Sequence, residues 1–190
     1  MSGSINSAYV GLNTIRLVLK PIWFQELPRP FDGGRTVTYR TKLEEAGMGW
    51  PALMRPDLPF APAVRVGDIV YVSGQIPETA DGAVVTGKVG RDIDLAGAQR
   101  SAALCAANVI YWLDRHLDGD LDRVVRIAKL TVYVNAVPDF TGFSQVGNGA
   151  SELVQKVFGD RGEHARCALG MGGLPLDVPV EVDAIVQVRD

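Results

Sequence analysis

The side chains best suited to chemistry gather in the last quarter of the chain. His164 and Arg166 precede a glycine-rich stretch at 170–173, and Glu181 follows it in a run of alternating apolar and polar residues. A guanidinium binds a carboxylate through two parallel N–H donors, and a glutamate can position a water molecule or carry a proton. We therefore expect Arg166 and Glu181 to lie on two strands joined by a Gly-Gly-Leu-Pro loop and to form one site for a small carboxylate.

The alternation around these residues predicts how their side chains point. Residues 180–188 repeat apolar and polar side chains with a period of two, which is typical of a half-buried strand. On a strand, His164 and Arg166 would share one face, and Cys167 and Leu169 would share the other. A solvated strand edge has the same spacing, so these residues indicate function only in combination with a neighbouring cleft.

Other motifs favour structural interpretations. The stretch 170–173 lacks the spacing G-x-G-x-x-G and leads into a strand, so we expect a tight connection there and no phosphate-binding loop. Ser73 lies outside any G-x-S-x-G motif, which argues against a serine hydrolase. Cys105 and His116 fall on the apolar stripe of a predicted helix, where a packed structural role is expected.

The sequence also limits metal sites, location and membrane contact. Two histidines and two cysteines without a C-x-x-C spacing predict no metal site and no disulfide scaffold. This cysteine usage fits a reducing compartment, so we expect a cytoplasmic protein. The segment 9–24 is too short and too polar to span a bilayer and lacks the features of a secretory signal, although its lack of acids, with the serines just before it, is shared with transit peptides. We expect no membrane partner.

Charge is divided between a basic beginning and an acidic remainder. Residues 1–40 carry a net charge of +3 and the rest −6, which gives −3 for the 190 residues. Prolines and glycines at 28–34 separate the two parts, so we divide the chain into an N-terminal arm, 1–40, and one domain, 41–190. Alternation at 14–19 favours a short strand within the arm. An acidic domain lacks the clustered Lys and Arg that bind phosphate backbones, so nucleic acid is not an expected partner.

Two long helices are predicted from apolar residues spaced three and four apart. The first runs from about 95 to 117 with Asp94 as its N-cap. The second ends at Gly159, and its start is unclear because two glycines weaken its first half. A short helical segment is expected at 41–47.

Strands are predicted at 68–75 and 123–134, in addition to the two that carry the chemical residues. An Asp-Gly turn at 81–82 predicts that 83–89 is the hairpin partner of 68–75. The order β-β-α-β-α-β-β predicts an α+β sandwich in which two helices cover one face of a single sheet. The other face would then be buried by neighbouring copies of the chain.

Short motifs in consistent order connect these elements to a known family. They are Phe-Ala-Pro-Ala-Val-Arg-Val-Gly-Asp at 60–68, Val-Ser-Gly-Gln-Ile-Pro at 72–77, Gly-Lys-Val-Gly at 87–90, Asn-Gly-Ala-Ser-Glu-Leu at 148–153, Phe-Gly at 158–159, His-Ala-Arg at 164–166, Leu-Pro at 174–175 and Val-Glu-Val at 180–182. In these motifs the chain resembles the Rid/YjgF family of reactive intermediate deaminases over residues 41–190, and more narrowly its endoribonuclease L-PSP-like branch.

This resemblance implies a fold, an assembly and a reaction. The fold would be chorismate mutase-like, α+β with a single mixed sheet, and would assemble as a homotrimer with three clefts between subunits. The reaction would be the cofactor-free hydrolysis of an imine or enamine of a small carboxylate to a keto acid and ammonia. Arg166 matches the arginine that holds the substrate carboxylate, Glu181 matches the glutamate that positions water, and His164 would be an added proton carrier.

The resemblance also implies a set of substrate-binding residues, some of which depart from the family. The set is Phe60, Ser73, Gly74, Gln75, Ser144, Asn148 and Cys167. Phe60 replaces the tyrosine of many deaminases and removes a hydroxyl. Ser144 or Asn148 must replace an asparagine of the second helix. Cys167 directly follows Arg166, whereas the deaminases commonly have their cysteine two residues after the arginine.

Three functions are consistent with these observations. The first is a cofactor-free deaminase, or a related hydrolase that acts on an imine, enamine or amide-like nitrogen of a small carboxylate. The second is a non-catalytic trimer that binds a keto acid or another small ligand for regulation, and the missing hydroxyl at position 60 fits it. The third is an endoribonuclease, which the family's name suggests and the acidic domain disfavours.

Overall fold

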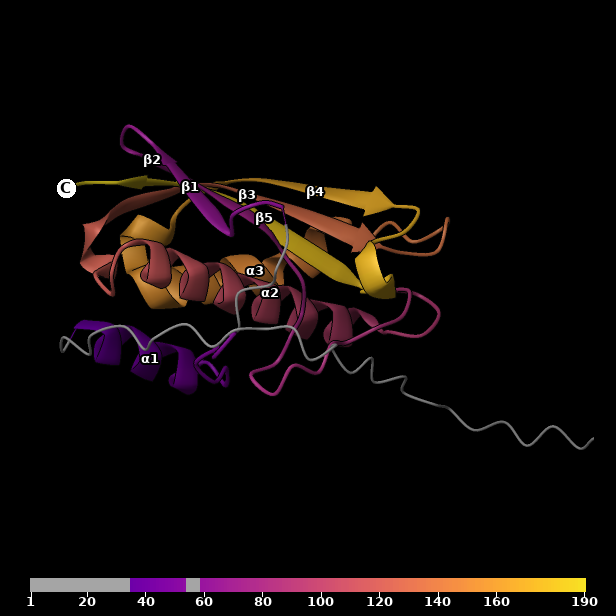
Figure 1. Cartoon of the computed structure of the whole chain (residues 1–190). Helices are drawn as coiled ribbons and strands as arrows, with labels where there is room; N and C mark the ends of the chain where they lie inside the picture. Colours follow the sequence, from indigo (N-terminus) through magenta and orange to yellow (C-terminus); the bar gives the residue numbers. More distant parts are fainter. Residues whose placement is uncertain (1–34, 54–58) are drawn as a thin grey trace, which may run out of the picture.

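One mixed sheet of five strands carries the residues of interest. The strands are β1 (Ala63–Val66), β2 (Ile69–Gln75), β3 (Val124–Asn135), β4 (Ala165–Met171) and β5 (Val180–Val188). This computed structural model describes residues 35–53 and 59–190, and its strands lie side by side in the order β1-β2-β5-β3-β4 (Figure 1). β4 is parallel to β3, and the other neighbouring strands are antiparallel.

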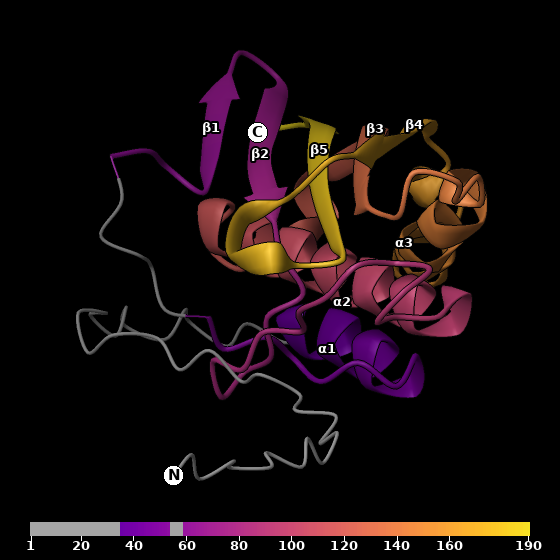
Figure 2. The same cartoon turned by 90° about the vertical axis from the view of Figure 1, so that its right-hand side faces the viewer.

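The α-helices of the described ranges all lie on one side of this sheet. They are α1 (Arg35–Glu45), α2 (Leu95–His116) and α3 (Phe143–Phe158). α2 and α3 pack directly against the sheet, and α1 forms an outer layer beyond them (Figures 1 and 2). The predicted α+β class, with two helices against one face of a single sheet, is confirmed, and α1 is an additional helix behind those two.

The core lies between the sheet and the two inner helices. From β5, the side chains of Val180, Val182, Val186 and Val188 point toward the helices, and each is at most 1% exposed. Ala184 continues this buried row at 2% exposure, and Glu181, Asp183, Ile185 and Gln187, which alternate with it, are only partly buried. This alternation confirms the half-buried strand predicted at 180–188.

α2 begins and packs as its sequence predicts. The Asp94 carboxylate accepts a hydrogen bond from the backbone N–H of Gly97 at 2.6 Å, which confirms the N-cap. Cys105 is fully buried, and burial raises the pKa of its thiol well above the ordinary value. His116 is partly buried at the end of the helix, and burial lowers the pKa of its imidazole. Neither this helix nor any other in the described ranges has the length and apolar character of a membrane span.

α3 begins at Phe143 despite the glycines in its first half. A Cβ atom at Gly149 would overlap the backbone carbonyl of Gln99 on α2, so the glycine lets the two helices approach closely. The helix ends at Gly159, whose φ of 60° lies in the left-handed region. A glycine that made the start of this helix unclear in the sequence thus allows its packing against α2.

The predicted hairpin partner of β2 is wrong. β2 pairs with β1 across a turn at Gly67, whose φ is 61°, and residues 83–89 form a connection with single bridges to Glu78 and Ala136. Gly87 has a φ of 121° and interrupts this stretch. A segment must have a continuous extended backbone to join a sheet, and the backbone of residues 83–89 is not continuously extended.

α1 crosses the expected boundary between arm and domain. It begins at Arg35, before the helical segment predicted at 41–47, and the Tyr39 side chain is only 3% exposed. The Tyr39 hydroxyl donates to the Asp122 carboxylate at 2.6 Å and accepts from Arg161 at 2.7 Å. The division at residue 40 stays a prediction, and the strand predicted at 14–19 lies outside the described residues.

Candidate functional site

The Arg166 guanidinium is held by one face of α3. Its Nη1 donates to Asn148 Oδ1 and to Ser151 Oγ, and its Nη2 donates to the carbonyl oxygen and the Oγ of Ser144, all at 3.0 Å. These three helix residues follow one another at intervals of four and three, which places them on one side of the helix. Gly147 lies beneath the guanidinium, since a Cβ there would be 3.1 Å from Arg166 Cζ.

The register of the sheet explains why Arg166 points toward this helix. Arg166 on β4 is paired with Leu130 on β3, which is paired in turn with Ala184 on β5. Leu130 and Ala184 are buried on the helix-covered face. Directly paired residues share a face, so the Arg166 side chain also leaves the sheet on the helix side.

Glu181 lies on the opposite face of the sheet. It is paired with Tyr133, which is paired with Leu169, and it alternates with the buried Val180 and Val182. The expectation that Arg166 and Glu181 meet in one site is therefore wrong for a single chain. β3 lies between their strands, and their positions have opposite parity in the register.

Glu181 has a half-buried environment of its own. A Cβ at Gly74 would overlap its carboxylate, so the glycine makes room for this side chain. Burial, and then the neighbouring Asp183, raise the pKa of the Glu181 carboxyl above its ordinary value. The Tyr133 hydroxyl donates to Asp183 Oδ2 at 2.8 Å. A carboxyl group with a raised pKa is suited to proton transfer nearer neutral pH.

His164 is connected to Arg166 through Ser151. The His164 Nδ1 is 2.6 Å from the carbonyl oxygen of Gly162, and the Nε2 is 2.9 Å from Ser151 Oγ. A carbonyl can only accept, so Nδ1 carries a hydrogen; the Ser151 hydroxyl donates to Nε2 when the ring is neutral and accepts from Nε2–H when it is protonated. The structure thus confirms that His164 and Arg166 lie on one side, and it adds Ser151, which the sequence reasoning missed. The signal was its position three residues after Asn148 on the same helix face.

The predicted substrate-binding residues divide between these two places. Ser144 and Asn148 contact Arg166, whereas Cys167 is paired with Thr131 and so lies on the face of Glu181. Gly74 also lies at Glu181.

The remaining three lie in or just before the first hairpin. The Ser73 hydroxyl donates to the Ala61 carbonyl at 2.7 Å, and Gln75 Nε2 donates to the Ser73 carbonyl at 2.8 Å. Phe60 precedes β1 and is 54% exposed. These side chains support or border the hairpin, and no contact in the described chain brings them to Arg166.

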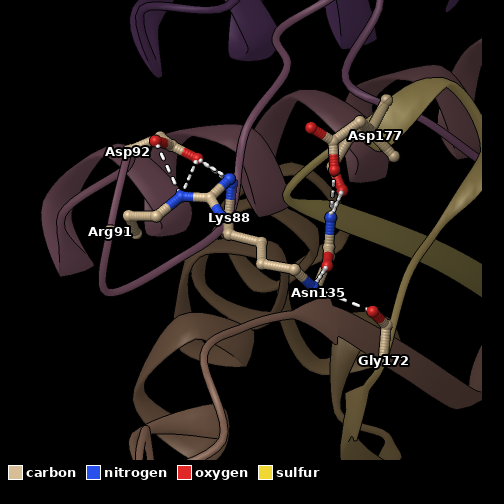
Figure 3. A network of polar contacts seen from close by, with 7 residues as sticks. Lys88, Arg91, Asp92, Asn135, Gly172 and Asp177 are labelled. Carbon is tan, nitrogen blue, oxygen red and sulfur yellow. Dashed lines mark hydrogen bonds and ion pairs between the residues drawn. The ribbon is translucent and has the colours of Figure 1, made fainter.

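A polar network fixes the loop between β4 and β5, as Figure 3 shows. Lys88 Nζ donates to Asn135 Oδ1 and to the Gly172 carbonyl, the latter at 2.8 Å. The buried Asn135 amide donates to Asp177 Oδ1 at 3.0 Å and to the Val178 carbonyl at 3.1 Å. The stretch 170–173 therefore forms the end of β4 and a fixed connection, and the network holds the chain where it enters β5 and leads to Glu181.

The same loop holds a costly backbone conformation. Leu176 and Asp177 have φ angles of 55° and 57°, in the left-handed region, which costs about 1–3 kcal/mol for a residue other than glycine. The Asp177 carbonyl accepts from the Gly87 backbone N–H at 2.7 Å and its carboxylate accepts from Asn135, so contacts from two other segments stabilise this strained turn. Beside it, hydrogen bonds from Arg91 and from the backbone N–H of Lys88, the latter at 2.9 Å, lower the pKa of the Asp92 carboxyl to about 2 (Figure 3).

Comparison with known proteins identifies relatives over most of the chain. Residues 52–188 match the family model described as Endoribonuclease L-PSP. Protein TCP17 of Trypanosoma cruzi is 42% identical over 78% of this chain and 92% of its own length. The crystal structure of Atu1372 from Agrobacterium tumefaciens, of unknown function, is 41% identical with a TM-score of 0.77, and the match covers 83% of this chain and 97% of that one. A 2-iminobutanoate/2-iminopropanoate deaminase of Dermatophagoides farinae is 25% identical over 73% of this chain and 93% of its own.

Proposed function

Because the chain belongs to the endoribonuclease L-PSP family, also called YjgF/Rid, we propose that it is a deaminase that needs no cofactor. It hydrolyses the imine or enamine of a small carboxylate and releases a keto acid and ammonia. The relative from Dermatophagoides farinae is named for such a reaction. The observation that carries the proposal is the fixed Arg166 guanidinium, with the hydroxyl and imidazole groups beside it.

Arg166 binds the substrate carboxylate at the edge of the sheet. Four hydrogen bonds from its Nη1 and Nη2 atoms to α3 hold the guanidinium in one orientation before the substrate arrives. The carboxylate takes the place of the Ser144 hydroxyl, because this exposed group can turn toward water at little cost. A carboxylate also brings a full negative charge to the guanidinium, which the Ser144 hydroxyl lacks.

Glu181 reaches this substrate from a second copy of the chain. Arg166 and Glu181 leave opposite faces of the sheet, so one chain cannot apply both to the same small molecule. The helix-free face also exposes large apolar side chains, which a neighbouring copy would bury. They are Val64, Val66, Tyr71, Leu169 and Met171. We therefore propose the homotrimer that the family resemblance implies, with sites between subunits.

The reaction requires only water and proton transfers. Water adds to the C=N carbon, the nitrogen of the resulting carbinolamine takes up a proton, and ammonia leaves as the C=O bond forms. Glu181 orients the water, accepts a proton from it as the C–O bond forms, as its raised pKa allows, and passes that proton to the imine nitrogen, which gives the neutral carbinolamine. Proton transfer by positioned side chains contributes about 10²–10⁴-fold.

An ammonia-release assay tests this function. 2-Iminobutanoate is generated in place from 2-aminobutyrate by an amino-acid oxidase, and ammonia formation is compared with and without the protein. We expect a rate that rises in proportion to protein concentration and that falls by one to two orders of magnitude in Arg166→Ala. Equal rates with and without the wild-type protein would contradict a deaminase.

A ligand-binding trimer without turnover is the second candidate. It is favoured by the position of Glu181, which within one chain leaves the sheet on the face opposite to Arg166. Isothermal titration with 2-ketobutyrate separates the candidates when read with the ammonia assay. Binding that Arg166→Ala abolishes, together with no ammonia release, would favour this second function.

A further inference from the structure

Ser151 joins the two functional side chains on the helix side of the sheet. Its Oγ is 3.0 Å from Arg166 Nη1 and 2.9 Å from His164 Nε2. Asn148 Oδ1 accepts from the same Nη1 at the same distance, and within the described residues it makes no hydrogen bond with His164. The structure therefore offers two groups that support Arg166 equally, of which Ser151 also contacts an imidazole.

We propose that Ser151 is a proton relay between His164 and the substrate held at Arg166. This proposal rests on the deaminase function above and names the source of the proton that the leaving nitrogen needs. Arg166 cannot be that source, because a guanidinium stays protonated in proteins. Imidazole, in contrast, takes up and releases protons near neutral pH.

The ring of His164 is fixed so that only Nε2 exchanges a proton. Its Nδ1–H donates to the Gly162 carbonyl at 2.6 Å in both charge states. Gly162 is itself held in place, because it is buried and a Cβ there would be 2.6 Å from the Val154 carbonyl. A group that holds one ring nitrogen selects the tautomer and the direction of the other. Nε2 is therefore directed at Ser151.

A hydroxyl in this position can donate one proton and accept another at the same time, so its own protonation state does not change. Ser151 donates its proton to the carbinolamine nitrogen while it accepts one from Nε2–H of protonated His164, so the C–N bond can break and ammonia leaves. The carbinolamine hydroxyl then returns a proton through Ser151 to Nε2 as the C=O bond forms. Imine and water thus give keto acid and ammonia, and both side chains end in their starting state.

A matched pair of variants tests the relay in the full-length protein. Ser151→Ala and Asn148→Ala each remove one acceptor 3.0 Å from Arg166 Nη1, so both should raise KM for the imino acid by a similar factor. Only Ser151→Ala removes the contact with His164, so its kcat should be at least about tenfold below that of Asn148→Ala. Alanine favours a helix, so α3 should form in both variants, which circular dichroism checks.

Rescue and non-additivity complete the test. Ser151→Thr keeps a hydroxyl and should restore most of kcat, whereas His164→Ala should lower kcat as much as Ser151→Ala, and the double variant no further. Equal kcat in Ser151→Ala and Asn148→Ala, or losses at Ser151 and His164 that add in full, would overturn the relay while leaving the deaminase function intact. No ammonia release by the wild-type protein would overturn both.

Discussion

At Arg166, one guanidinium holds the protein's own helix and, in the function proposed here, also a ligand. Its bonds to Ser144, Asn148 and Ser151 tie β4 to α3, so the residue contributes to packing as well as to binding. A carboxylate therefore competes with groups that already occupy the N–H donors. A small keto acid binds only to the extent that its charge outweighs the hydroxyl it replaces.

Replacement of Arg166 by lysine separates these contributions. An ammonium lacks two parallel N–H donors, so we expect kcat/KM to fall by roughly one to two orders of magnitude, as for a lost bond of about 1.5–3 kcal/mol. The melting temperature should fall by a few degrees, because part of the contact with α3 is lost. Steady-state kinetics and calorimetry measure both effects. Wild-type rates in the lysine variant would remove Arg166 from the mechanism.

We expect the substitution Glu181→Gln to increase the free energy of unfolding relative to wild type, and to do so more as the pH rises. Because its carboxyl pKa is raised in the folded state, its contribution to stability is fully present below the unfolded pKa and is lost as pH rises through the folded pKa. Glu181→Gln removes that loss, so the variant should gain stability relative to wild type between about pH 4 and pH 7. Urea unfolding at both pH values measures the difference. If the stability of Glu181→Gln relative to wild type is greater at pH 4 than at pH 7, the ionised Glu181 carboxylate is stabilised in the folded state, which would contradict the prediction.

At the scale of elements, glycines set how closely the two inner helices approach. We expect Gly149→Ala to destabilise the fold by about 1–3 kcal/mol, because the new methyl would overlap the Gln99 carbonyl. Gly172→Ala is the control, since a Cβ there has no neighbour within 4 Å. Urea denaturation of both variants tests this. Similar stability in the two variants would mean that α2 and α3 separate easily.

The outer helix α1 predicts different effects for two N-terminal deletions. Deletion of 1–34 removes only residues before α1, whereas deletion of 1–40 also removes Tyr39 and its contacts with Asp122 and Arg161. We expect both proteins to fold, with the shorter one less stable by about 3–5 kcal/mol, as for loss of a buried aromatic side chain. Thermal unfolding compares them. If the two deletions are equally stable, the boundary expected at residue 40 is the correct one.

At the scale of the whole molecule, the uncovered sheet face predicts association. We expect light scattering at micromolar concentration to give the mass of a trimer. Leu169→Glu, a charge on this face at a position 44% exposed, should shift the mass toward the monomer while circular dichroism stays unchanged. Gln155→Glu adds the same charge on exposed α3 and should keep the wild-type mass. A monomeric wild-type protein would contradict the trimer and the shared site.

Local patterns were sufficient for most elements of this chain. The Asp94 cap, the apolar stripe of α2 and the alternation of β5 each depend on residues within a few positions of one another, so the sequence predicts them. The side on which His164 and Arg166 lie follows from the same two-residue period. The family motifs add the assignment of Arg166 and Glu181 as candidate residues.

The tertiary structure decided which of these residues can act together. Strand order places β3 between the strands of Arg166 and Glu181, and the register sends their side chains to opposite faces. In the folded chain β1, and not 83–89, is the hairpin partner of β2. The fold also brings Ser151 between Arg166 and His164. Pairing between distant segments is set by packing of the whole core, and a shift of one residue reverses every side chain, so no local pattern contains it.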